Sequence, residues 1–204
     1  MNARTLAFAA ALAFACSHVE TPSESSAKPA GGGGDPLAAF ETVKTVLQSP
    51  RCVNCHPTGD SPLQGDDSHV HPQFVTRGPE GKGAPGLACA TCHALANTPA
   101  SYGAHMPPGV STGWRLPPPE HKMVFAGMAS GPLCEQLKDA KRNGGKDMAA
   151  LFKHVSSDPL VLWGWSPGYG RPPVPIAHDD FVKAFKTWMD AGAPCGPVKT
   201  ASLP

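Results

Sequence analysis

The chain has almost no net charge. Its 17 Lys and Arg residues are nearly balanced by 16 Asp and Glu, which gives a formal charge of +1 at pH 7. A nucleic-acid-binding protein needs a basic face to neutralise phosphates, and this composition offers none. We therefore expect no nucleic-acid partner.

Long apolar runs and strand patterns are also missing. Beyond the first few positions, no run of eighteen apolar residues could cross a membrane in the mature protein. No segment of useful length alternates apolar and polar residues as a strand does. Proline (24 residues) and glycine (22 residues) interrupt the 204-residue chain throughout. These features predict an all-α protein of few helices and long irregular loops.

The N-terminus resembles an export signal. Residues 1–16 read MNARTLAFAAALAFAC, with Arg4 before a short apolar stretch and Ala13-Phe14-Ala15 as a cleavage-site pattern. Cys16 stands where a bacterial lipoprotein signal places its lipid-bearing cysteine, although Ala13 replaces the usual leucine and Phe14 is bulky. The alternative for Cys16 is an ordinary residue lost with the signal. We expect export to the periplasm or the outer face of a bacterial membrane, with a lipid anchor at Cys16.

The residues after the signal divide into a tether and a domain. Residues 17–35 are rich in Ser, Pro, Gly and charge, a composition that cannot bury a core. We expect a flexible tether there and one folded domain over residues 36–204. Helical spacing of apolar residues predicts helices within 35–48, 132–145, 146–155 and 178–192.

The clearest chemical signal is a repeated motif, RCVNCHP followed by ACATCHA. C-x-x-C-H is the attachment signature of c-type haem. The two thiols form thioethers with the porphyrin vinyl groups, and the adjacent histidine binds the iron as proximal ligand. The sequence therefore predicts a cytochrome c-like fold with loops wrapped around two haem c groups, held by Cys52, Cys55, His56, Cys89, Cys92 and His93.

Zinc held by the same four cysteines is the main alternative. Structural zinc sites favour C-x₂-C pairs about 15–20 residues apart, whereas 33 residues lie between Cys55 and Cys89. Zinc also gives no reason for a histidine directly after both pairs. A nearby GKGAPG string, residues 81–86, matches a dinucleotide-binding pattern, but its context predicts a loop.

The remaining cysteines, Cys134 and Cys195, form an even pair. Disulfides persist in exported proteins, so we expect these two residues to be bonded to each other. The alternative is two buried thiols.

Each iron needs a sixth ligand, and several side chains could supply it. His69 and His71 follow the first motif closely, and we choose His71 for the first iron. For the second iron we choose Met123, in a proline-led loop like the methionine-bearing loops of His/Met cytochromes. The residues in reserve are His69, His154 and His105. Two haems with these different ligands would differ in midpoint potential, because thioether sulfur raises the potential and bis-imidazole ligation lowers it.

Other residues have roles that depend on the haems. Haem propionates need cationic partners, and the candidates are Arg51, Arg77, Arg115 and Arg171. A Gly/Pro-rich loop carries Trp163, Trp165 and Tyr169. Packing on a porphyrin or over the core is favoured for these aromatic side chains, and a partner-docking surface is the alternative.

Four strings resemble a family of small di-haem proteins often labelled isoquinoline 1-oxidoreductase subunit. They are SPRCVNCHPTGDSPLQGDDSHVH, GAPGLACATCH, LCEQLKDAKRNGGKDMAALFKHV and DPLVLWGWSPGYGR, within residues 47–195. The resemblance implies an electron-accepting partner of a molybdenum hydroxylase that oxidises N-heteroaromatic rings. It implies no hydroxylase activity for this chain, which lacks any sequence resembling a molybdopterin site or an iron–sulfur cysteine set.

The function expected is therefore electron transfer, from a molybdenum hydroxylase to the respiratory chain, through a transiently docking redox partner. The alternative is a di-haem redox enzyme such as a peroxidase, which needs one open iron site. A haem-based sensor would need an attached signalling domain.

Overall fold

The computed structural model describes residues 34–197. The predicted signal, its Cys16 and nearly all of the predicted tether lie outside the described residues. Within residues 34–197, no helix is both long and apolar enough to cross a membrane.

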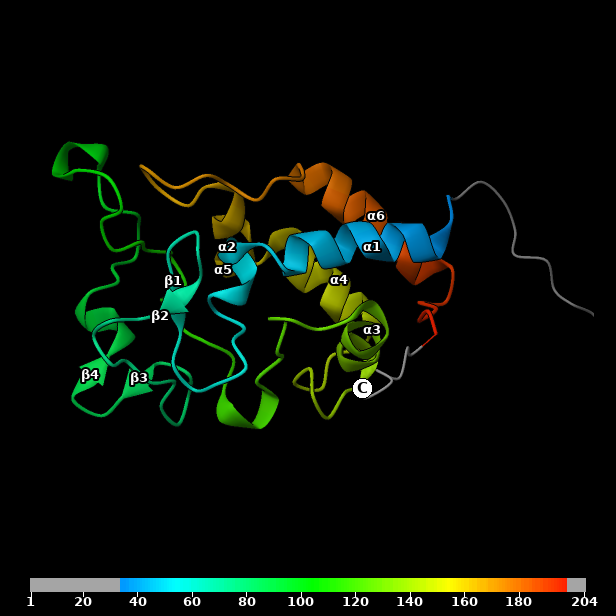
Figure 1. Cartoon of the computed structure of the whole chain (residues 1–204), viewed down its shortest axis with the longest axis horizontal. Coiled ribbons are helices and arrows are strands. Elements are labelled where there is room, and N and C mark those ends of the chain that lie inside the picture. The colour runs from blue at the N-terminus through cyan, green and yellow to red at the C-terminus, as the bar shows by residue number, and fades with distance from the viewer. Residues whose placement is uncertain (1–33, 198–204) are drawn as a thin grey trace, which may run out of the picture. The chain divides into compact units, whose positions relative to one another are not determined.

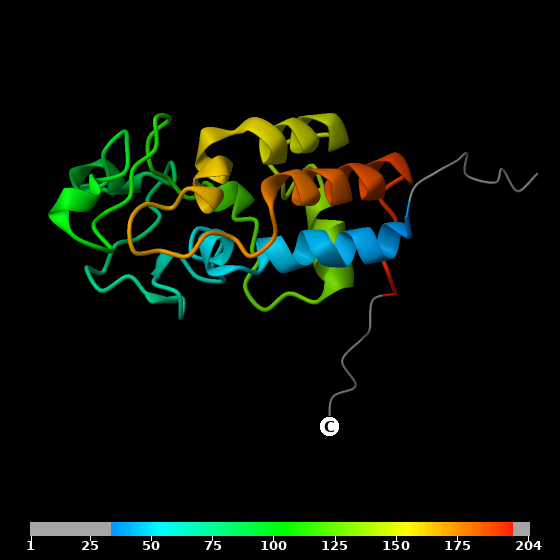
Figure 2. The same ribbon diagram turned by 90° about the horizontal axis from the view of Figure 1, so that it is seen from above.

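Two helices at opposite ends of the domain sequence form the centre of the fold. α1 (Pro36–Leu47) and α6 (His178–Asp190) lie side by side in Figures 1 and 2. The rings of Phe40 and Trp188 join them, with centroids 4.9 Å apart. Asp35 begins α1, since its carboxylate accepts a hydrogen bond of 2.9 Å from the Leu37 amide, and proline occupies the first helical position.

α3 (Ser130–Lys138) and α4 (Met148–Ser157) complete the helical core. α3 packs against α1, and α4 packs against α6. The buried apolar side chains come from all four helices and the segments that join them; among them are Phe40, Val43, Phe125, Leu133, Leu137, Leu151, Phe181, Phe185 and Trp188. The predicted disulfide is confirmed: Cys134 in α3 is bonded to Cys195, 61 positions later.

α3 is shorter than the sequence predicts. The expected helix continues to Gly144 and Gly145, but the structure ends it at Lys138. Asp139 takes an extended conformation, and its carboxylate accepts a hydrogen bond of 2.9 Å from the Lys141 amide. Asn143 then donates from its side chain to the carbonyl of Leu137, at 2.7 Å. These short polar side chains offer the backbone an alternative to the helix.

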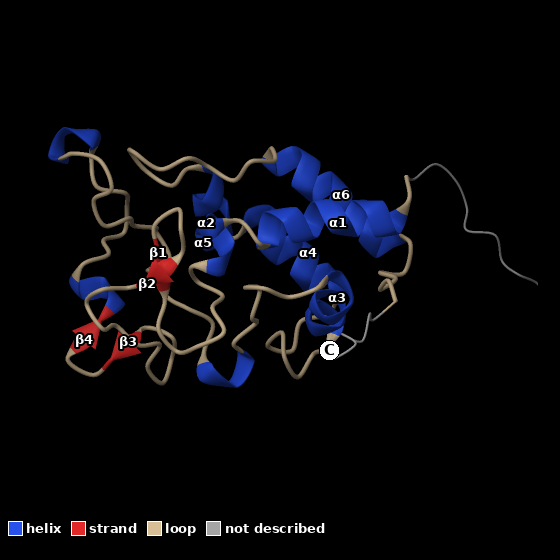
Figure 3. Cartoon of the chain, viewed as in Figure 1, coloured by secondary structure: helices blue, strands red, loops and turns tan. Residues whose placement is uncertain are grey.

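The rest of the described chain is mainly loop, as Figure 3 shows. Two antiparallel ladders of two-residue strands occur there: β1 (Leu63–Gln64) with β2 (His69–Val70), and β3 (Gly83–Ala84) with β4 (Leu87–Ala88). The GKGAPG string, predicted to be a loop, contains β3 and the turn to β4, and the segment after it is a strand rather than the helix that dinucleotide binding needs. The short helical turns are α2 (Pro50–Val53), α5 (Pro159–Leu162), η1 (Cys89–Thr91), η2 (Ala100–Tyr102), η3 (Pro119–His121) and η4 (Trp163–Trp165).

Candidate functional site

The first C-x-x-C-H motif forms a single turn at the end of α2. The Cys52 carbonyl accepts hydrogen bonds of 3.1 Å from the amides of both Cys55 and His56. Cys52 and Cys55 are free thiols. Burial raises the pKa of Cys52 to about 11 and that of Cys55 to about 12. Both groups are therefore neutral thiols at physiological pH, presented from one turn of backbone.

The His56 ring is oriented by a hydrogen bond at its Nδ1. Its Nδ1 lies 2.6 Å from the Met123 carbonyl oxygen, which can only accept, so Nδ1 carries the proton. Nε2 is then the unprotonated nitrogen, which is the form that binds a metal. Burial lowers the pKa of His56 to about 4, so the ring is neutral at physiological pH. Phe125 stacks on it, with ring centroids 3.8 Å apart.

The second motif repeats this arrangement. The Cys89 carbonyl accepts hydrogen bonds from the amides of Cys92, at 3.2 Å, and His93, at 3.0 Å. Cys89 and Cys92 are also free thiols. The His93 Nδ1 donates to the Pro108 carbonyl at 2.8 Å, which again leaves Nε2 unprotonated. Burial is the main cause that lowers the pKa of His93.

An aromatic cluster backs the second histidine. Trp114 stacks on His93, with ring centroids 4.8 Å apart, and Trp163 meets Trp114 edge-on at 4.8 Å. The Trp163 indole donates to the Asn97 side-chain oxygen at 3.0 Å. The sequence singled out Trp163 but not Trp114, because nothing in the GWRLPPP string indicates that its indole lies on His93.

The two motifs lie within electrostatic reach of each other. Burial is the main cause of the raised pKa of Cys55, and electrostatic interaction with the nearby Cys52 and Cys89 raises it further. Hydrogen bonds connect the segments between the motifs: Arg77 donates from its amide to the Asp60 carbonyl at 2.7 Å, and Gly83 donates to the Arg77 carbonyl at 2.9 Å. Cys89 then donates to the Lys82 carbonyl at 2.8 Å.

The sixth-ligand candidates are distributed differently from the sequence-based assignment. Met123, chosen for the second iron, lies at the first motif, where its carbonyl holds His56. His71, chosen for the first iron, lies close enough to His93 to lower its pKa, after the larger effect of burial. His71 Nδ1 is buried and has no hydrogen-bond partner.

The three reserve candidates for a sixth ligand lie in different surroundings. His154 lies close enough to His56 to lower its pKa, again after the larger effect of burial. Its Nδ1 bonds to the Asp158 carboxylate at 3.0 Å, leaving Nε2 for another partner. His69 is exposed and paired with Asp67 at 2.6 Å. His105 is exposed, and its amide donates to the Tyr169 carbonyl at 3.1 Å.

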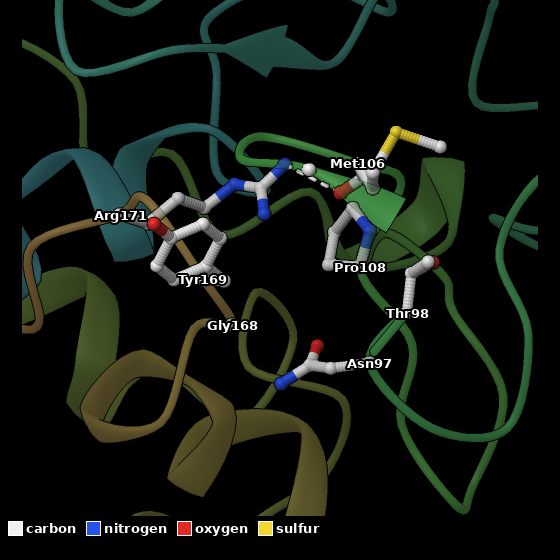
Figure 4. A pocket seen from close by; sticks show the side chains of 8 residues that line it. Asn97, Thr98, Met106, Pro108, Gly168, Tyr169 and Arg171 are labelled. Atoms are coloured by element: carbon white, nitrogen blue, oxygen red, sulfur yellow. Dashed lines mark hydrogen bonds between the residues drawn. The ribbon is translucent and has the colours of Figure 1, made fainter. Parts of the chain in front are cut away.

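The arginines proposed for propionates already have protein partners. Arg51 is buried and paired with Asp66, and Arg77 is buried among carbonyl groups. Arg115 donates to the Thr112 carbonyl at 2.9 Å. Arg171 borders a pocket that Pro108 also lines, shown in Figure 4, where its guanidinium donates to the Met106 carbonyl at 2.7 Å.

Trp165 and Tyr169 differ in exposure. Trp165 stacks on Phe181, with centroids 5.5 Å apart, and belongs to the core packing. Tyr169 lines the pocket in Figure 4 and is exposed. Packing therefore explains both indoles of this loop, Trp163 and Trp165, in the described part of the chain.

Both motifs share the donor set that haem c attachment uses. Each presents two thiols and one imidazole with a free Nε2 from a single turn. By contrast, no group of three or more His, Cys, Asp or Glu side chains among residues 34–197 is gathered closely enough to hold a metal ion by itself. A scan against protein-family models and searches of curated proteins and of solved structures found no match.

Proposed function

We propose that this chain is an exported di-haem c-type cytochrome that transfers electrons. The observation that supports it best is the duplicated local geometry: each motif pairs free thiols with a neutral histidine whose Nδ1 is held by a backbone carbonyl. Haem would supply a one-electron ferric/ferrous couple at each motif.

The chain's own residues have defined tasks in this proposal. Cys52 and Cys55 would each form one thioether bond to the first haem, and Cys89 and Cys92 would each form one to the second. The carbonyls of Met123 and Pro108 fix the orientation and tautomer of the two histidines, and such partners of a ligand also raise its basicity. Phe125 and Trp114 restrict rotation of the rings by stacking.

The donor and the location rest on sequence resemblance. A molybdenum hydroxylase that oxidises N-heteroaromatic compounds is the proposed electron donor, and the respiratory chain the proposed acceptor. The export signal and the lipid anchor at Cys16 remain part of the same proposal, and place the domain at the outer side of a bacterial membrane.

The test is production of the full chain in a bacterial host that assembles c-type cytochromes. We expect a coloured protein whose mass exceeds that of the processed peptide and any lipid by two haems. The double variant Cys52→Ala/Cys55→Ala should carry one haem, and so should Cys89→Ala/Cys92→Ala. Colourless wild-type protein from a host that matures a control cytochrome would refute the proposal.

Spectra of the wild-type protein separate the carrier from the enzyme. A carrier has six-coordinate low-spin iron at both sites. A peroxidase would show one high-spin ferric haem, since its reaction needs an open position.

A further inference from the structure

Arg77 is a buried cation beside the first motif. Its side chain is 1 % exposed. Its guanidinium donates to the carbonyls of Gly59, at 3.1 Å, and Pro117, and its Nε lies 3.4 Å from the Asp60 carboxylate. A guanidinium stays protonated in a protein at physiological pH, so a full positive charge is fixed here.

The carboxylate opposite Arg77, that of Asp60, also pairs with Lys122. The same Asp60 oxygen that faces Arg77 lies 2.9 Å from the Lys122 ammonium. Asp60 is also well exposed, with 62 % of its side chain accessible, so water screens its charge. The other buried arginine near this motif, Arg51, has Asp66 as its own partner. One screened carboxylate thus faces two cations, of which one is fully buried.

The position of this charge is set by the loop that joins the two motifs. Arg77 follows β2 by seven positions, and its amide and carbonyl bond to Asp60 and Gly83, on the two sides of the loop. Gly59 and Asp60, which the guanidinium contacts, are the third and fourth residues after His56. Asp60 also pairs with Lys122, whose neighbour Met123 holds the His56 ring through its carbonyl. The buried charge therefore lies next to the segments that carry and orient the proposed ligand of the first haem.

We propose that Arg77 is a positioning residue whose buried charge raises the midpoint potential of the haem attached at Cys52 and Cys55. The inference rests on the proposed function. Reduction adds one electron to the ferric iron and lowers the charge of the site by one, with no bond made or broken. A fixed cation in a poorly solvated position favours the less positive, reduced site.

The experiment is a potentiometric titration of the haem-loaded full chain with dithionite and mediators, followed in the visible spectrum. We expect Arg77→Gln to lower one of the two midpoint potentials and leave the other in place. Arg77→Lys, which keeps the charge but loses the fork of donors, should lower the same potential by less. Lys186→Gln is the matched control, because it removes an exposed cation paired with Asp190 on α6 and should move neither potential.

A second variant works in the opposite direction. Asp60→Asn removes the carboxylate that faces Arg77, so the same midpoint should rise, and by less than Arg77→Gln lowers it because water screens the exposed Asp60. If Arg77→Gln yields no haem-loaded protein, the result for Asp60→Asn decides the matter: a rise in one midpoint supports the proposal, and unchanged midpoints overturn it.

Failure of this inference differs from failure of the proposed function. Two attached haems whose midpoints do not respond to Arg77→Gln, or shift equally, would overturn the role of Arg77 and leave the cytochrome intact. Protein without haem would instead refute the cytochrome itself.

Discussion

At the scale of single residues, one hydrogen bond to a backbone carbonyl sets the orientation and the tautomer of each motif histidine. His56 and His93 both use Nδ1 to bind a carbonyl, so both offer Nε2. The sixth ligand of each proposed iron must come from elsewhere in the chain. His154, in α4, lies close enough to His56 to lower its pKa, and His71 does the same to His93, in both cases after the larger effect of burial.

We predict that His154→Ala converts one haem from low-spin to high-spin, because Asp158 holds the ring of His154 through Nδ1 and His154 lies close enough to His56 to lower its pKa, after the larger effect of burial. Electron paramagnetic resonance of the ferric protein measures this directly. His69→Ala is the control, since His69 is exposed and paired with Asp67. The sequence-based choice of Met123 for the second iron makes a different prediction. In that case Met123→Leu would abolish a near-infrared charge-transfer band and His154→Ala would change neither haem.

Asn97 connects two loops around the second motif. Its side-chain oxygen accepts from the Gly109 amide, at 3.1 Å, and from the Trp163 indole, while its amide donates to the Ser166 carbonyl at 2.9 Å. Asn97→Ala leaves these groups without partners, so we expect a loss of about 1–3 kcal/mol in the free energy of unfolding. Urea titration measures it, with the neighbouring Thr98→Ala, which loses one hydrogen bond to the Pro107 carbonyl, as the milder comparison.

At the scale of elements, helix starts depend on short polar side chains. Asp147 accepts a hydrogen bond of 2.8 Å from the Ala150 amide and begins α4. Asp147→Ala should lower the free energy of unfolding by about 1 kcal/mol, and Asp147→Asn by less, because asparagine also caps helices. Equal losses for both variants in thermal unfolding would show that the carboxylate charge, rather than the cap, matters.

The helices were more predictable than the loops for a physical reason. α1, α4 and α6 have apolar residues at helical spacing, and Asp35 and Asp147 cap the starts of α1 and α4, so periodicity and capping identify these helices. α3 ended early because Asp139 and Asn143 compete for backbone groups, which a pattern of apolar residues does not register. The motif cysteines and histidines were found from spacing alone. Their carbonyl partners at Met123 and Pro108 were not, because any residue provides a carbonyl and only the folded chain shows which one arrives.

At the scale of the whole described chain, one covalent bond ties the last segment to the core. Cys134 is fully buried in α3, and Cys195 follows α6. The double variant Cys134→Ala/Cys195→Ala should lose about 2–5 kcal/mol of stability, since the bond restricts the unfolded chain. Thermal unfolding with and without dithiothreitol measures it. The reductant should lower the melting temperature of the wild type and not that of the double variant; an equal effect on both would contradict the prediction.

The placement of this bond has a consequence for how the protein is made. An exported chain meets an oxidising compartment in which any two of its thiols can be joined, yet the proposed cofactor chemistry needs four of them reduced. The span between Cys134 and Cys195 contains no other cysteine, and both motifs precede it. Cys134 and Cys195 are thus consecutive cysteines of the chain, and their bond closes a loop that includes neither motif. If haem attaches as proposed, this disulfide can form without using any of the four motif thiols.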